Sequence, residues 1–169
     1  MKKVSILLSL ITILSIASLT VNAQVKATAD ASANIIGPIS IVKNTNMSFG
    51  NIAVSSTLAG TVVLDEASAR TKTGGVTLPV ITGTVSAAKF TVSGQSGTTY
   101  AITLPASVVL SNGVNSMTVD GFTSTPTAAG SLATGTEEIF VGATLNVAAG
   151  QISGLYTNTT DLVVNVNYN

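Results

Sequence analysis

Residues 137–147, EEIFVGATLNV, decide the fold class, because apolar and polar side chains alternate along them. The apolar positions form a single row: Ile139, Val141, Ala143, Leu145 and Val147. Successive side chains of a β-strand point to opposite faces, so a period of two places this row on one face. The stretch therefore predicts a long strand whose apolar face packs against a core.

The same alternation recurs on both sides of this strand. It predicts strands over residues 25–35, 76–82, 88–92, 99–104 and 156–168, among others, while Asn112-Gly113 between two apolar runs predicts a hairpin turn. Small and polar residues predict loops over residues 67–75 and 123–136, and no window has a sustained helical period. We therefore predict an all-β protein, an immunoglobulin-like or pilin-like β-sandwich of about 8–9 antiparallel strands.

The first 23 residues are typical of an export signal. Lys2 and Lys3 precede an uncharged run over residues 4–21, and Val21-Asn22-Ala23 ends it with the small-x-small pattern of a signal-peptidase site. We predict a cleaved Sec signal peptide over residues 1–23 and one β-sandwich domain over residues 24–169. The alternative is an N-terminal membrane anchor. After cleavage we expect no membrane span, and a location in the periplasm, at the cell surface or outside the cell.

The composition excludes several function classes. The chain has no His and no Cys, which excludes histidine-activated nucleophiles, histidine metal sites and thiolate chemistry. Charged residues make up 8% of the chain, with seven basic and seven acidic side chains, which excludes a nucleic-acid-binding module. The neighbouring acids of Asp65-Glu66 and Glu137-Glu138 should point to opposite faces of a strand. We predict no catalytic residue, cofactor or metal, and a hydrolase would require carboxylates that converge in a cleft.

The two ends of the predicted domain are its most informative parts. The N-terminal strand has an apolar row at Val25, Ala27, Ala29, Ala31, Ala33 and Ile35. The C-terminal strand has one at Leu162, Val164, Val166 and Tyr168. The N-terminal strand can be the first strand of its own sandwich, or it can leave and add to the sheet of a neighbouring copy. Donation from each copy to the next would produce a head-to-tail fibre.

Several segments, in order, resemble a bacterial secreted family, domain-of-unknown-function family 4402. They are residues 32–41, 47–52, 75–78, 90–94, 100–105, 141–145, 154–156 and 164–168. More distantly, the plan is similar to spore-coat-U-type proteins and chaperone–usher pilins, which pair an early strand and a Phe-Gly segment with a C-terminal Gly…Tyr strand. That resemblance implies a periplasmic chaperone that binds the C-terminal strand. The chain departs from many such pilins in lacking a cysteine pair and in its alanine-rich N-terminal strand.

Together these observations favour a secreted, non-catalytic structural or surface protein, such as a fimbrial subunit that assembles by strand edges. Its expected partners are further copies of itself, in a fibre or surface layer, and a periplasmic chaperone. The alternative is a soluble adhesin or carbohydrate-binding module. Such a module would need an exposed aromatic side chain, for which Phe140 is the candidate because it is out of phase with Ile139 and Val141.

Overall fold

A computed structural model describes residues 24–169, so the predicted signal peptide lies outside the described residues. The chain divides into two units, residues 1–35 and residues 36–169. Residues 24–35 of the first unit belong to no strand, and all of their side chains are exposed. The strand predicted over residues 25–35 is therefore not formed in this structure. A strand needs a partner for its backbone groups, and a row made mostly of Ala gains little from burial by itself.

Residues 36–169 form antiparallel strands and contain no helix. The strands are β1 (Ser40–Thr45), β2 (Ser48–Phe49), β3 (Ala53–Val54), β4 (Gly60–Leu64), β5 (Arg70–Lys72), β6 (Val76–Thr77), β7 (Val85–Ser86), β8 (Ala88–Ser93), β9 (Thr98–Thr103), β10 (Ser107–Ser111), β11 (Ser116–Thr125), β12 (Ala129–Leu132), β13 (Thr136–Val147) and β14 (Asn165–Tyr168). The all-β prediction is confirmed, although the strands are shorter and more numerous than expected.

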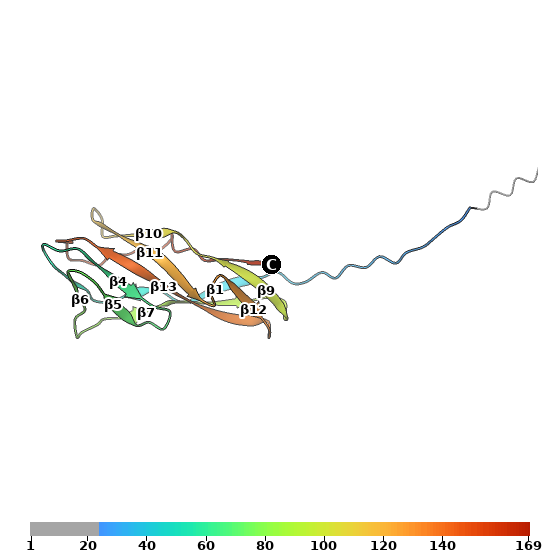
Figure 1. Cartoon of the computed structure of the whole chain (residues 1–169), viewed down its shortest axis with the longest axis horizontal. Coiled ribbons are helices and arrows are strands. Elements are labelled where there is room, and N and C mark those ends of the chain that lie inside the picture. Colours follow the sequence, from blue (N-terminus) through green and yellow to red (C-terminus); the bar gives the residue numbers. More distant parts are fainter. Residues whose placement is uncertain (1–23) are drawn as a thin grey trace, which may run out of the picture. The chain divides into compact units, whose positions relative to one another are not determined.

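Strand β13 organises the main sheet (Figure 1). One of its edges pairs with β8 along its first half and with β4 along its second half, and its other edge pairs with β11. The sheet continues from β8 to β1, from β11 to β10 and from β4 to β5. A second sheet has the order β12-β9-β14, and β2–β7 and β3–β6 form two small pairs. The long strand predicted over residues 137–147 is thus present and central.

The two sheets enclose one of two core clusters. Phe90, Ile139 and Val141 of the main sheet pack there against Tyr100 and Leu132 of the second sheet. This face-to-face packing makes the arrangement a β-sandwich, as predicted.

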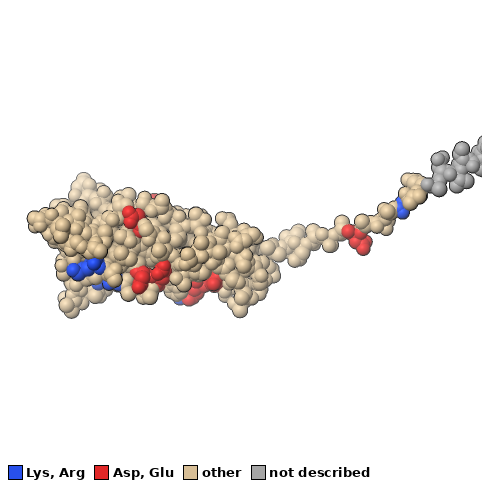
Figure 2. All heavy atoms as spheres, viewed as in Figure 1, with Lys and Arg blue, Asp and Glu red and all other residues tan. Residues whose placement is uncertain are grey.

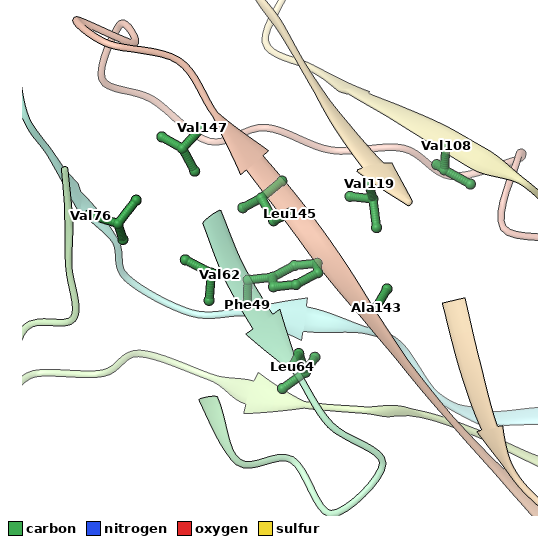
Figure 3. Packing of buried hydrophobic residues seen from close by; sticks show 9 residues of the cluster. All are labelled: Phe49, Val62, Leu64, Val76, Val108, Val119, Ala143, Leu145 and Val147. Carbon is green, nitrogen blue, oxygen red and sulfur yellow. The ribbon is translucent and has the colours of Figure 1, made fainter. Parts of the chain in front are cut away.

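The other core cluster is closed differently. Leu145 and Val147 of β13 pack there with Val62 and Leu64 of β4, and the ring of Phe49 lies over them (Figure 3). Short pairs and loops, in place of a complete second sheet, cover this end of the main sheet. The cover contributes Phe49 from β2 and Val76 from β6.

Two of the predicted loops contain strands. Within residues 67–75, β5 returns along β4 after a turn in which the Asp65 carboxylate accepts a hydrogen bond from the Ala69 amide. Within residues 123–136, β11 continues to Thr125 and β12 pairs with β9. Both segments are rich in Thr, Ser and Ala, and their pairing gives them an order that their weak apolar pattern does not predict.

Two predicted strands are shorter than expected. The strand over residues 76–82 is only β6, and the strand over residues 156–168 is only β14. In the latter, the side chain of Asn158 accepts hydrogen bonds from the amides of Thr160 and Asp161. Such a side-chain turn replaces strand pairing locally.

One partly buried polar contact joins the two sheets. The Tyr100 hydroxyl donates to the Glu137 carboxylate at 2.9 Å, and the Ser131 amide donates to the same oxygen at 2.7 Å. Burial, together with the neighbouring Glu137 carboxylate, raises the pKa of Tyr100 well above its usual range. The hydroxyl therefore stays protonated in the folded protein at pH values that ionise an exposed tyrosine.

We predict that Leu145→Ala lowers the free energy of unfolding by about 2–5 kcal/mol, because it leaves a cavity in a packed core. Leu145 is 1% exposed, whereas Val163 is 50% exposed, so Val163→Ala is the matched control and should change stability little. Urea denaturation of residues 24–169 measures both. If both variants lost the same free energy of unfolding, packing around Leu145 would not stabilise the fold as we propose.

We predict that Tyr100→Phe flattens the fall in stability above about pH 10, the pKa of an exposed tyrosine. The raised pKa means that stability from Tyr100 is complete below that pH and is lost as pH rises, because the unfolded chain ionises first. Below that pH the variant should be about 0.5–1.5 kcal/mol less stable, through the lost hydrogen bond. Chemical denaturation between pH 7 and 11 measures both effects, and an unchanged alkaline slope would contradict the assignment.

Candidate assembly site

A groove of about 990 Å³ opens over the core cluster that contains Phe49. Most of residues 43–54 form one wall, and most of residues 151–162 form the other. Strands β10, β11 and β13 contribute to the floor. The volume is at the upper end of the range of about 300–1,000 Å³ found for small-molecule pockets.

The floor of the groove is apolar. Val108, Val119 and Leu145 are buried in it, and Leu110 and Met117, which face each other across β10 and β11, are half-buried. Lys43 is the one charged residue among the described residues that line the groove. A ligand that fits here must therefore offer apolar side chains and no charge to the floor.

An arginine fixes the first wall. The guanidinium of Arg70, the single arginine of the chain, donates hydrogen bonds to the carbonyl oxygens of Phe49 and Asn51. Between them, Gly50 has a φ of 68°, which favours glycine and turns the chain. The contacts hold the wall in place while the Phe49 ring anchors it in the core.

Side-chain hydrogen bonds fix the second wall. The Tyr156 hydroxyl donates to the Ile152 carbonyl at 2.8 Å and accepts from the Gln151 side chain at 2.9 Å. Asn158 donates to the Val109 carbonyl of β10 and to the Asp161 carboxylate. Hydrogen bonds from Asn158 and Thr160 lower the pKa of Asp161, so this carboxylate stays ionised at more acidic pH than an ordinary aspartate.

Both walls contain backbone edges without a partner strand in the described part of the chain. Strands β1, β2 and β3 pair only with β8, β7 and β6, each along one edge. In the second wall, Thr157 alone forms a bridge, to Ser111 of β10. An additional strand between the walls would find backbone groups to pair with on either side.

The predicted N-terminal residues lie in the first unit, and their side chains are exposed. Val25 is 92% exposed and Ile35 is 94% exposed. The alanines between them, Ala27, Ala29, Ala31 and Ala33, are exposed as well. The alternating row of apolar side chains is thus exposed along the whole segment.

The structure brings the predicted C-terminal residues together in the domain. Leu162, Val164, Val166 and Tyr168 pack against the core cluster between the two sheets. Val166 pairs with Ile102 and Tyr168 with Tyr100, so β9 occupies one edge of β14. The Tyr168 hydroxyl also donates to the Gly37 carbonyl at 3.1 Å and accepts from the Gln95 amide at 2.7 Å.

The sequence did not point to the groove. Its floor comes from strands that are far apart in the chain, and alternation says only that Leu110 and Met117 face inward. The single arginine was the one available signal, because a lone Arg in a nearly uncharged chain suggests a specific hydrogen-bonding role.

The other candidate residues form no chemical site in the part of the chain that the structure describes. Glu137 points inward to Tyr100, and Glu138 points outward to Lys89 at 2.7 Å, so the two acids lie on opposite faces as predicted. Phe140 is half-buried, with the Lys89 ammonium 5.3 Å from its ring centre. Within residues 24–169, no three acidic side chains gather where they could hold a metal ion. The same residues contain no helix that is long and apolar enough to cross a membrane.

Comparison with known proteins places the chain in a family. Residues 39–168 match the family described as Domain of unknown function (DUF4402). The match covers more than half of the chain, so this protein belongs to that family, as the resemblance implied. Neither a curated protein nor a solved structure matches the chain significantly. The family description assigns no activity.

We predict that Arg70→Met loosens the first wall of the groove, because two carbonyl oxygens lose a charged donor. The free energy of unfolding should fall by about 1.5–3 kcal/mol, the usual range for hydrogen bonds to charged groups. Lys72→Met, two residues along the same strand and exposed, is the control. Hydrogen exchange of residues 49–52 should rise in the Arg70 variant alone, and equal exchange in both variants would contradict this role.

Proposed function

We propose that this protein is an exported, non-catalytic structural protein of the cell surface, whose copies join through strand edges. Each copy supplies residues 25–35 as a strand to the next copy. The observation that carries the proposal is the N-terminal segment: it has the alternation of a half-buried strand, yet all its side chains are exposed and it belongs to no strand.

The physical argument concerns burial. A row of alternating apolar side chains gains free energy only when one face is covered, at about 25 cal/mol per Å². The strands of residues 36–169 do not include this segment, and in our proposal a neighbouring copy supplies the covering surface. β-Strand addition supplies both the surface and the missing backbone hydrogen bonds.

The weak charge of the domain supports the same function. Charged side chains are few and scattered on the face in Figure 2. The ion pair of Lys89 with Glu138 is exposed, with 31% and 52% of the side-chain surfaces accessible, and such pairs contribute little. Assembly would therefore depend on apolar burial and backbone pairing, and it should be insensitive to salt.

The alternative of a carbohydrate-binding module has less support. Every Phe and Tyr side chain in residues 24–169 is at least partly buried, including Phe140, and sugar rings are usually held by exposed aromatic faces.

The proposal also includes the route to the cell surface. The protein is exported and lies outside the cytoplasm, and a periplasmic chaperone shields the subunit before assembly.

We predict that the apolar row, and not the segment's charge, governs assembly. Ala29→Arg together with Ala31→Arg should abolish multimers, because the row can no longer be covered without burying two charges. Thr28→Arg together with Ser32→Arg adds the same charge to the polar row and should leave the multimers intact. Light scattering of residues 24–169, purified from the periplasm, measures the size of each.

Deletion of residues 24–36 gives a second test. If the intact protein forms multimers and the deletion variant is monomeric, the segment joins the copies. If the intact protein is a stable monomer at all concentrations, the proposed function is wrong, and a glycan screen becomes the next experiment.

A further inference from the structure

The groove over the core cluster of Phe49 offers a specific place for the N-terminal segment. We propose that the groove between residues 43–54 and residues 151–162 of one copy receives residues 25–35 of a second copy, with the alanine row facing the floor. This inference rests on the proposed function, and it adds the acceptor site and the face of the segment that enters it.

The backbone of both walls suits a strand. Residues 25–35 are eleven residues, about 36 Å long when extended at about 3.3 Å per residue. Each wall is a stretch of consecutive chain, so part of the segment can lie between them with backbone groups on either side.

The apolar side chains of residues 25–35 also suit the floor of the groove. Leu110, Met117 and Phe122 line the groove and are only partly buried, so they offer apolar surface that an entering row of apolar side chains can cover. The row of the segment has four alanines in its middle and the larger Val25 and Ile35 at its ends. The small alanines let the segment's backbone approach the floor closely, while Val25 and Ile35 add apolar surface at the two ends of the row.

The charges of the segment do not oppose insertion. Lys26 and Asp30 belong to the polar row, so both would face solvent when the alanine row faces the floor. Reversing the two faces would bring both charges onto an apolar floor, at a high desolvation cost. One face of the segment is therefore selected over the other.

The groove in the same copy is the competing acceptor. The Gly37 carbonyl is bound by the Tyr168 hydroxyl, and Ile39 packs in the cluster between the sheets, so the chain just before β1 is already fixed. This fixed attachment favours a second copy, and the experiment below separates the two acceptors.

Disulfide trapping tests the proposal, because the chain has no native cysteine. Ala27, Ala29, Ala31 or Ala33 is changed to Cys one at a time, each combined with Met117→Cys in the full chain exported to the periplasm. A disulfide needs Cα atoms about 4.4–6.8 Å apart, and alternate residues of a strand are about 6.6 Å apart, so at least one pair should react. We expect the monomer band to be lost to dimers and a longer ladder on a non-reducing gel.

Two matched controls fix the geometry. Thr118→Cys replaces Met117→Cys on the opposite face of β11, where the side chain is exposed, and should give no ladder. Thr28→Cys, from the polar row of the segment, should not react with Met117→Cys. If Met117→Cys lowers the yield of folded protein, Leu110→Cys, its partner across β10 and β11, repeats the test.

Each outcome decides the inference. A ladder from the alanine row and Met117 alone supports it. A disulfide-linked monomer places the segment in its own groove and overturns it. Multimers by light scattering without any groove disulfide also overturn it but leave the proposed function standing, whereas absence of multimers and of groove disulfides removes both.

Discussion

The apolar face of β13 is the constraint on which the rest of the structure depends. Its first half, with Ile139 and Val141, closes the core between the two sheets. Its second half, with Ala143, Leu145 and Val147, closes the core below the groove. Its two edges pair with three different strands, so a shift of its register by one residue would turn every one of these side chains away from both cores.

The two cores have different covers, and the groove follows from that difference. The second sheet, β12-β9-β14, covers the first half of β13 completely, and the contact of Tyr100 with Glu137 ties the sheets together. Over the second half, the cover consists of short pairs, the Phe49 ring and a wall that hydrogen bonds from Arg70 hold in place. Among residues 24–169, backbone edges on both sides of the groove are therefore left without partner strands.

The same chain contains an apolar groove, between residues 43–54 and residues 151–162, and an exposed segment with an apolar row, residues 25–35. Val25 and Ile35 remain exposed at the two ends of an otherwise alanine row, while the groove floor offers Leu110 and Met117 only partly covered. The free energy of covering both is available to a pair of copies, and the same contact can repeat from copy to copy because donor and acceptor lie on different surfaces. Membership in the DUF4402 family assigns no activity.

The sequence alone determined the all-β class and the long strand over residues 137–147, because the alternation of apolar and polar side chains is a local property of the chain. It also determined the inward direction of Leu162, Val164, Val166 and Tyr168, which do pack in a core. It did not determine that β5 and β12 are strands, since Thr- and Ser-rich segments become strands only when a neighbour pairs with them. Nor did it determine that residues 25–35 lack a partner, or that a groove opens between residues 43–54 and 151–162. Both depend on which strands meet across the chain, and that is decided by tertiary packing.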